Sequence, residues 1–317
     1  MTVTGDTDTA REGGSTKRES VRTVVAYLGP RGTFTEEAVR KTAKLEGAPF
    51  VDGAATMYVP CDTIEETLEF CAEGNADIAV VPIENSLGGA VVSATDYLGT
   101  QDGGPGLDVV GETVLEIRQC LWGLPGATRE DVELVYSHPQ ALLQCREYLK
   151  SLPKLRGRVA TVSTSAAATV IRSKHESSLG GPLIGEVYGL DAIAENVQDV
   201  AHNRTRFLIL RKRTNAVTDA LPECFGEKTA LACALDGERP GALAEGLMFF
   251  ANRGINLVRI ESRPRHGRLG EYTFFFDLDT SAAASGGRAE EDVRAALEDL
   301  RRTASYFRVL GTYDVWN

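Results

Sequence analysis

Short apolar runs alternate with helix-like segments along the first two thirds of the chain. VVAYLG, residues 24–29, predicts a strand, and TEEAVRKTAKLEG, residues 35–47, predicts a helix that Thr35 caps and Gly47 ends. The same order recurs, with strands that run into polar turns predicted at 76–86, 132–140 and 158–165. Strands that alternate with helices indicate an α/β fold with a mainly parallel sheet.

The segment 107–124 separates the first of these repeats from the later ones. We interpret its two apolar runs around Gly111 as strands that cross into a second lobe, and residues 187–210 as the return to the first. The pattern therefore predicts a two-lobed domain over 23–213, with lobe 1 at about 23–105 and 190–213 and lobe 2 at about 106–189. The polar residues 1–22 are expected to form a disordered tail.

The pattern changes after a polar connection at 214–226. Residues 227–317 read as strand, helix, strand, strand, helix, strand. This βαββαβ order is typical of the ferredoxin-like fold, and about ninety residues is a natural size for it.

Composition narrows the possible functions. The formal net charge of −11 argues against nonspecific binding to nucleic acid or to acidic membranes, which requires a basic surface. The six cysteines form no CxxC pair, no apolar run approaches the roughly 20 residues that span a bilayer, and the start of the chain has no secretory signal. We expect a cytoplasmic protein with reduced thiols. The four histidines are dispersed, so no metal site is predicted.

Hydroxyl and amide side chains recur where predicted strands give way to helices. Backbone N–H groups at such places bind carboxylates, although a Ser or Thr there often does no more than cap its helix. The residues concerned are Thr33, Thr35, Asn85, Ser86, Ser137, Gln140, Ser163, Thr164 and Ser165.

Charged residues near the strand ends leave two interpretations open. Glu84 could act as an acid or base, or pair with a neighbouring donor. Arg204 and Arg206 could each bind a substrate carboxylate through the guanidinium fork, or remain solvated. Because side chains alternate along a strand, these arginines share one face and Thr205 points to the other.

Taken together, these stretches resemble the prephenate dehydratase family, and the C-terminal unit resembles its ACT regulatory domain. GALAEGL (241–247) and ESRP (261–264) resemble the phenylalanine-binding signature of that domain. The stretches that match the catalytic domain are YLGPRGTFTEEA (27–38), VPIENSLGGAV (81–91), SHPQALLQC (137–145), TSAAA (164–168), YGL (188–190) and NRTRF (203–207). Gly185, Glu186 and Val187 depart from the small alanines that the family commonly has before YGL.

The resemblance implies a catalytic domain shaped like a periplasmic binding protein, with its site between the lobes. The implied reaction converts prephenate to phenylpyruvate, water and carbon dioxide without a cofactor, and the essential threonine falls on Thr205. We assign catalytic roles to Thr205, Glu84 and Ser86. Substrate binding is assigned to Thr33, Phe34, Asn85, Ser137, Gln140, Thr164, Ser165, Asn203, Arg206 and Phe207.

The resemblance also implies feedback inhibition by L-phenylalanine, bound to a homodimer or homotetramer that forms through ACT domains. The implied effector site comprises Gly241, Ala242, Leu243, Glu261, Ser262, Arg263 and Pro264. Two alternatives remain at this stage: an arogenate dehydratase, which performs the same elimination on the transaminated substrate, and a non-catalytic amino acid sensor.

Overall fold

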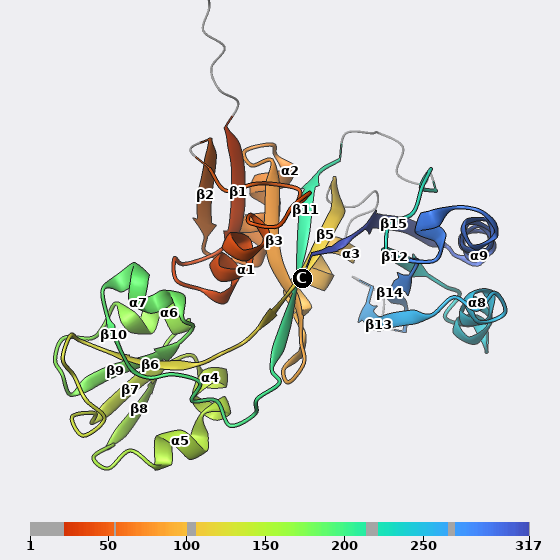
Figure 1. Ribbon diagram of the computed structural model, residues 1–317. Coiled ribbons are helices and arrows are strands. Elements are labelled where there is room, and N and C mark those ends of the chain that lie inside the picture. The colour runs from red at the N-terminus through yellow and green to blue at the C-terminus, as the bar shows by residue number, and fades with distance from the viewer. Residues whose placement is uncertain (1–21, 54, 100–105, 214–220, 266–269, 317) are drawn as a thin grey trace, which may run out of the picture.

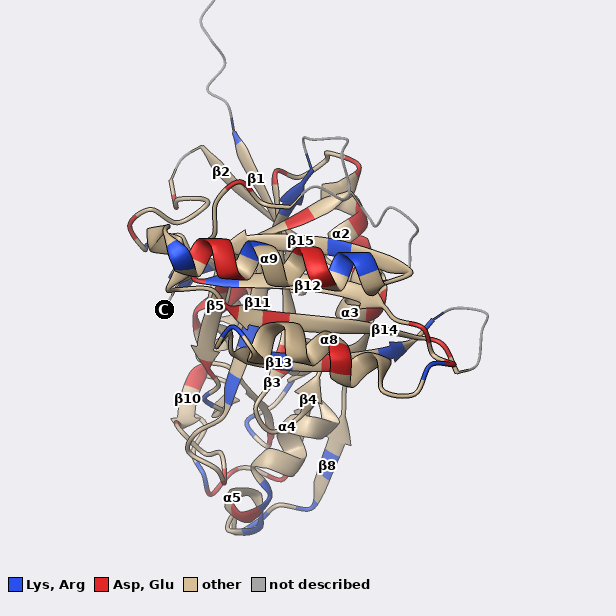
Figure 2. Ribbon diagram, turned by 90° about the vertical axis from the view of Figure 1, so that its right-hand side faces the viewer, with Lys and Arg blue, Asp and Glu red and all other residues tan. Residues whose placement is uncertain are grey.

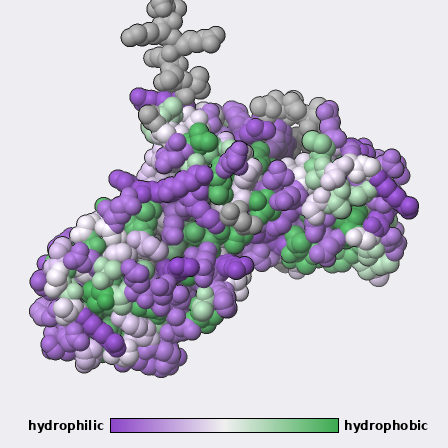
Figure 3. All heavy atoms as spheres, viewed as in Figure 1, coloured by the Kyte–Doolittle hydropathy of each residue, from purple (hydrophilic) through white to green (hydrophobic). Residues whose placement is uncertain are grey.

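The computed structural model describes residues 22–53, 55–99, 106–213, 221–265 and 270–316, which form three blocks. Lobe 1 lies in the middle, and lobe 2 and a C-terminal unit project from it in different directions (Figure 1). On the face displayed in Figure 3, apolar residues stand among polar ones on each block. The predicted tail 1–22 lies outside the described residues except for Arg22, as does 214–220 of the predicted connection.

Lobe 1 is a mixed sheet with helices packed against it. Its strand order is β16-β5-β11-β3-β1-β2, with β4 paired to β3. β1 is parallel to β2 and β3, whereas β11 is antiparallel to both β3 and β5. The strands are β1 (Thr23–Leu28), β2 (Thr56–Cys61), β3 (Ile78–Asn85), β4 (Gly89–Ala90), β5 (Leu107–Glu116), β11 (Arg204–Lys212) and β16 (Val315–Trp316); the helices are α1 (Phe34–Thr42), α2 (Ile64–Ala72) and α3 (Val92–Gly99).

Lobe 2 is a smaller sheet with short helices. Its strand order is β10-β6-β9-β7-β8, in which β7 is parallel to β8 and β9 while β6 is antiparallel to its neighbours. The strands are β6 (Cys120–Gly123), β7 (Leu134–Ser137), β8 (Gly157–Ala160), β9 (Glu176–Gly180) and β10 (Asp191–Ala194); the helices are α4 (Pro139–Gln144), α5 (Arg146–Lys150), α6 (Thr164–Ala168) and α7 (Leu183–Tyr188).

The structure corrects the predicted boundaries between the lobes. The whole of β5 belongs to lobe 1, so the chain crosses after Glu116 and not near residue 106. β10 pairs with β6 in lobe 2, so the return lies beyond residue 190. Gly111, predicted to separate two apolar runs, lies inside β5. A Cβ atom at this position would lie about 3.0 Å from the Trp316 ring. Close packing therefore explains this glycine.

The C-terminal unit has the predicted βαββαβ order. Its strand order, β13-β14-β12-β15, is fully antiparallel and defines a ferredoxin-like unit. Helices α8 and α9 cover the outer face of this sheet, as Figure 2 shows. The elements are β12 (Lys228–Ala234), α8 (Ala242–Ala251), β13 (Leu257–Pro264), β14 (Tyr272–Asp279), a 3-10 turn (Ala283–Ser285), α9 (Arg288–Thr303) and β15 (Tyr306–Tyr313).

The other face of the ferredoxin-like sheet packs directly on lobe 1. Ala232, Phe275 and Leu310 belong to the same buried cluster as Leu98 and Leu208 of lobe 1. After β15 the chain continues into β16, which pairs in parallel with β5 and so extends the lobe 1 sheet. The two blocks therefore share a core. Among the described residues, no helix combines the length and apolar character needed to cross a membrane.

Candidate functional site

A cavity of about 280 Å³ lies between lobe 1 and lobe 2. It receives side chains from the ends of β3 and β11, from the start of α1, and from α4 and α6 of lobe 2. The residues that line it include Thr33, Phe34, Thr35, Pro82, Asn85, Val91, Ile117, Gln119, His138, Gln140, Gln144, Val162, Ser163, Thr164, Asn203, Thr205 and Phe207. The polar turns that the sequence places after its strands thus meet in one cleft.

The amide of Asn85 holds Thr205 in this cavity. Asn85 Oδ1 accepts hydrogen bonds from the backbone N–H groups of Leu87 at 3.1 Å and Gly88 at 2.7 Å. These two donors fix the orientation of the amide, because only its oxygen can accept them. Asn85 Nδ2 then donates to Thr205 Oγ1 at 2.8 Å and to Asn203 Oδ1 at 2.7 Å.

This arrangement determines what the Thr205 hydroxyl can do. An amide nitrogen has two protons, and the two short bonds from Asn85 use both. Thr205 Oγ1 is therefore an acceptor toward Asn85, and its own proton is left to donate elsewhere. Thr205 is buried but lines the cavity. The site consequently presents a hydroxyl donor to a bound molecule.

The start of α1 forms the lobe 1 wall beside this cluster. Thr33, rather than Thr35 as predicted, caps the helix: Thr33 Oγ1 accepts from Glu36 N at 3.3 Å and donates to Leu28 O at 3.1 Å. The Glu36 carboxylate accepts in turn from Gly32 N at 2.6 Å, which completes a reciprocal cap. Gly32 has φ of +81°, a conformation that favours glycine. The turn is therefore fixed by its own hydrogen bonds.

Lobe 2 contributes the facing wall. Gln140 and Gln144 lie one turn apart in the same helix, and both line the cavity. Asn203 Nδ2 donates to Gln144 Oε1 at 3.3 Å, which links the start of β11 to lobe 2. His138 Nδ1 accepts from the Gln140 N–H at 3.3 Å, so the ring caps α4 through this nitrogen.

The cavity is polar but has little charge. None of the described residues that line it is Asp, Glu, Lys or Arg, and His138 is the one histidine among them. Hydroxyls, amides and backbone N–H groups are instead the available partners. Such neutral donors orient a ligand with carboxylate and hydroxyl groups through hydrogen bonds rather than ion pairs.

The structure places five predicted site residues outside the cavity lining: Arg206, described below, and Glu84, Ser86, Ser137 and Ser165. Glu84 precedes Asn85 on β3 and turns to the other face, 3.4 Å from Arg206. Ser86 Oγ accepts from Arg204 N at 2.9 Å and so fixes the start of β11. Ser137 Oγ donates to Leu179 O at 2.6 Å inside lobe 2, and Ser165 is fully buried. These side chains support the framework of the site.

Arg206, predicted to bind substrate, points away from the cavity. Its guanidinium lies against Asp277 of the ferredoxin-like unit at 2.6 Å and Glu112 at 3.2 Å. Burial alone would lower the pKa of Arg206, but these carboxylates outweigh burial and raise the pKa above its usual value. Alternation along β11 is the reason, since Thr205 occupies the opposite face.

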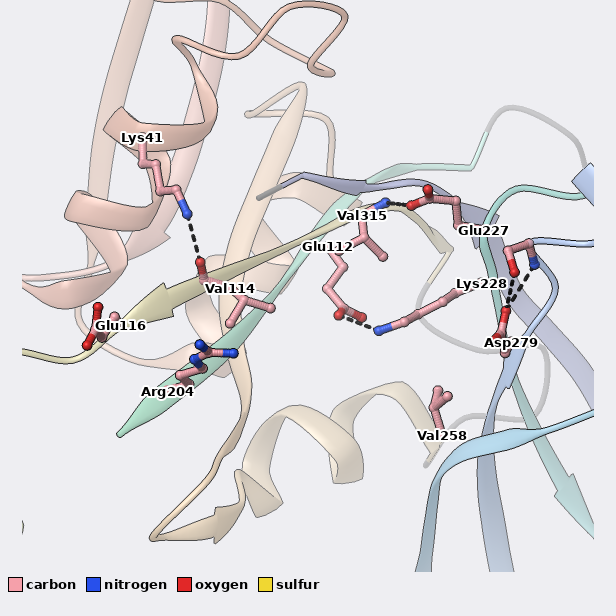
Figure 4. A pocket seen from close by; sticks show the side chains of 11 residues that line it. Lys41, Glu112, Val114, Glu116, Arg204, Glu227, Lys228, Val258, Asp279 and Val315 are labelled. Carbon is pink, nitrogen blue, oxygen red and sulfur yellow. Dashed lines mark hydrogen bonds and ion pairs between the residues drawn. The ribbon is translucent and has the colours of Figure 1, made fainter. Parts of the chain in front are cut away.

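A second cavity lies on the face of β11 that carries Arg204 and Arg206, between lobe 1 and the ferredoxin-like unit. Figure 4 shows Arg204 and Glu112 beside it, with Lys228 of the ferredoxin-like unit reaching Glu112 at 2.6 Å. Lys41 Nζ donates to Val114 O at 2.9 Å across another part of its wall. The arginines that flank Thr205 thus belong to the junction between two blocks and not to the interlobe cavity.

The predicted effector residues all lie in the ferredoxin-like unit. β12 and β13 are both antiparallel to β14. They therefore run in the same direction, and their C-terminal ends lie at the same end of the sheet. Gly241, Ala242 and Leu243 follow β12 at the start of α8, and Glu261, Ser262, Arg263 and Pro264 close β13. The Arg263 side chain, however, faces lobe 1, where it binds both oxygens of Asp96 at 2.6 and 3.0 Å.

Sequence reasoning missed several lining residues. Gln144 could have been found, because it stands four residues after Gln140 on a short helix. His138 lies within the SHPQ turn but was set aside when no metal pattern emerged. Gln119 and Val162 carry no pattern that distinguishes them from other residues near a strand end.

These features define a class: a two-lobed α/β protein with a polar ligand cavity between its lobes and a ferredoxin-like unit docked on lobe 1. The prephenate dehydratase family model matches residues 25–215. The chain belongs to the prephenate dehydratase family.

Individual relatives are similar to this chain over most of their length. The prephenate dehydratase of Amycolatopsis methanolica is 37% identical over 296 residues, which is 91% of this chain and 88% of that protein. The structure of prephenate dehydratase from Arthrobacter aurescens in complex with L-Phe is 34% identical, with a TM-score of 0.74 over 92% of this chain and 90% of that one. GqqA, described as a quorum quenching acylase, is 28% identical, with a TM-score of 0.75 over 92% and 98%.

The Asn85 amide offers a direct test of the site. In Asn85→Asp the new carboxylate cannot donate to Thr205, and it instead attracts the Thr205 proton. We expect kcat for prephenate to fall by roughly 10²-fold, as when one preorganised donor is removed. Asn75→Asp, an identical change at an exposed position, should keep the wild-type kcat. A kcat of Asn85→Asp within twofold of the wild type would contradict this role of the amide.

Proposed function

We propose that the interlobe cavity converts prephenate to phenylpyruvate, with Thr205 as the donor to the departing hydroxyl. The observation that carries this assignment is the Thr205 hydroxyl, whose oxygen is held by Asn85 and whose proton is free to point into the cavity. Membership of the prephenate dehydratase family indicates the reaction. The hydrogen bond from Asn85 supports the role that we assign to Thr205 in it.

The reaction makes one demand on the protein. The ring carboxylate leaves as carbon dioxide, its electron pair moves through the ring, and the carbon–oxygen bond to the ring hydroxyl breaks. Hydroxide is a poor leaving group, so the departing oxygen must receive one proton to become water. A threonine hydroxyl is a weak acid. We therefore assign Thr205 the donation of a hydrogen bond that can relay a proton, which solvent ultimately supplies.

The uncharged cavity suits this chemistry. Loss of carbon dioxide from a carboxylate is helped when no cation pairs with that carboxylate, because an ion pair would stabilise the ground state rather than the transition state. The neutral side chains of Thr33, Gln140 and Thr164 are placed to hold the substrate by hydrogen bonds instead. We assign them to substrate binding with Phe34, Asn85, Asn203 and Phe207.

The same property favours prephenate over arogenate. Arogenate has an ammonium group where prephenate has a keto group, and a buried ammonium requires a carboxylate partner. The described lining residues include no Asp or Glu.

An acylase activity, as named for GqqA, would need a nucleophile paired with a base. His138 is the candidate base in the described lining, and its Nδ1 is already occupied by the Gln140 N–H.

For the ferredoxin-like unit we propose the role of an ACT domain that binds L-phenylalanine. The relative from Arthrobacter aurescens was solved in complex with L-Phe. Here β12 and β13 run in the same direction, so the GALAEGL and ESRP stretches lie at the same end of the sheet. We retain Gly241, Ala242, Leu243, Glu261, Ser262 and Pro264 as effector residues, and assign Arg263 to the contact with lobe 1.

We further propose that two chains associate along β13. This strand is an edge of its sheet, and it exposes Val258 and Ile260 at 44% and 51%. Met248 of α8 is 49% exposed. Apolar side chains on an open edge strand are typical of a surface that another strand covers.

We also propose that the protein is located in the cytoplasm. All six cysteines are described and unpaired, which is consistent with a reducing compartment.

Replacement of Thr205 tests the catalytic assignment. We expect Thr205→Ala to lower kcat by roughly 10²- to 10⁴-fold, because it removes the donor to the leaving oxygen, and Thr205→Ser to keep a measurable part. Phenylpyruvate formation from prephenate is the measurement, with arogenate as the competing substrate. Thr169→Ala, an exposed threonine of lobe 2, serves as the control. Equal activity of wild type and Thr205→Ala would refute the assignment.

The effector assignment is tested by binding. We expect Glu261→Ala to weaken L-phenylalanine binding by about tenfold, since one charge-assisted contact to the amino group is lost. Isothermal titration calorimetry measures the dissociation constant, and Glu291→Ala on exposed α9 provides a matched control. If both variants bind phenylalanine like the wild type, the effector site does not involve Glu261.

A further inference from the structure

The residue after Thr205 connects the interlobe cavity to the ferredoxin-like unit. Thr205 lines the cavity on one face of β11, and Arg206 extends from the other face into the junction. A shift of the backbone at residue 206 therefore moves the hydroxyl of Thr205 as well.

Arg206 belongs to an ionic cluster that the two blocks build together. Arg206 and Glu112 come from lobe 1, and Asp277 and Lys228 come from the ferredoxin-like unit. Arg206 contacts Asp277 at 2.6 Å and Glu112 at 3.2 Å, while Lys228 contacts Glu112 at 2.6 Å. Apart from Glu84 of lobe 1, which lies 3.4 Å from Arg206 and is 43% exposed, each block thus supplies one cation and one anion. The Arg206, Glu112 and Asp277 side chains are only 11%, 1% and 7% exposed, so water screens these contacts weakly.

The hydrogen-bonded pairing between β11 and β3 is irregular near Thr205. The pairing between β11 and β3 shifts between Arg206 and Phe207, which face Glu84 and Pro82, so that Ile83 is an extra residue in β3. Pro82 has no N–H to offer to the ladder. On its other side β11 pairs regularly with β5 from Arg204 to Ile209. The guanidinium of Arg206 therefore adds to strand pairing at the place where the pairing with β3 is irregular.

We propose that Arg206 is a positioning residue for Thr205, and that Asp277 of the ferredoxin-like unit holds it in place. The proposal rests on the dehydratase function proposed above. Asp277 is not among the described residues that line the cavity, and it acts on the reaction through Arg206 and the backbone of β11. The ferredoxin-like unit is then part of the support of the active site.

Asp277→Asn tests this proposal because it removes the charge and keeps the shape. Misplacement of a reacting group by about 1 Å can cost roughly 10²-fold. We expect kcat for prephenate to fall by about tenfold or more and KM to change by less than about twofold, since the substrate contacts remain. Arg206→Lys, which keeps the charge but loses the fork, should lower kcat to an intermediate extent.

Asp96→Asn is the matched control. Asp96 forms the bidentate contact with Arg263 across the same junction, but it lies on α3, away from β11. We expect it to keep the wild-type kcat. Equal losses in Asp277→Asn and Asp96→Asn would overturn the proposal, because both would then report loosened docking. An unchanged kcat in Asp277→Asn would overturn it too.

Two further comparisons keep the test decisive. If thermal denaturation shows that Asp277→Asn is not folded, Arg206→Lys replaces it, because it loses the fork that contacts Asp277 and Glu112. An unchanged kcat in that variant would again overturn the proposal. A wild-type protein without turnover of prephenate would refute the proposed function itself. Equal kcat values in an active wild type and the Asp277 variant refute only the role of Arg206.

Discussion

A β-strand directs successive side chains to opposite faces of its sheet, and β11 uses both faces within three residues. Thr205 reaches the cavity between the lobes, while Arg206 reaches Asp277 and Glu112 in the junction with the ferredoxin-like unit. β11 also lies between β3, which supplies Asn85, and β5, which pairs with β16 at the end of the chain. In our proposal, the position of one hydroxyl therefore depends on lobe 1 and on the ferredoxin-like unit.

The two faces differ in their electrostatics. The described lining of the cavity has hydroxyls and amides but no permanent charge, whereas the junction concentrates buried ion pairs. Buried pairs are costly to separate, because each partner left alone would be a desolvated charge. Neutral amides can instead bind a dianion without holding its ring carboxylate so tightly that decarboxylation is slowed. The junction thus has buried ion pairs, whereas the cavity offers neutral hydrogen-bonding groups.

The sequence was sufficient for the architecture and for part of the site. Alternation of strands and helices, and the change of pattern near residue 227, predicted the two lobes and the ferredoxin-like unit. Polar residues at the strand ends predicted Thr33, Asn85, Gln140 and Thr164, and the family resemblance predicted Asn203 and Thr205. The structure brings these residues together in the cavity.

The remaining errors have physical causes. Alternation along a strand predicts that Arg206 and Thr205 take opposite faces, but tertiary packing decides which face borders the cavity. Glu84, Ser86 and Arg206 were therefore assigned to the cavity although they lie beside it in the framework. Gly111 looked like a break because its reason, the packing of Trp316 from the far end of the chain, is a contact between distant residues.

Hydrogen–deuterium exchange of the backbone amides tests most directly whether the junction holds β11. The measurement compares the wild type with Asp277→Asn, and follows peptides that contain residues 204–207 and, as a reference, β9 of lobe 2. If Arg206 anchors the strand, amides at 204–207 will exchange faster in the variant while those of β9 keep their rate. Equal exchange at 204–207 in both proteins would contradict the claim that the ferredoxin-like unit sets the position of Thr205.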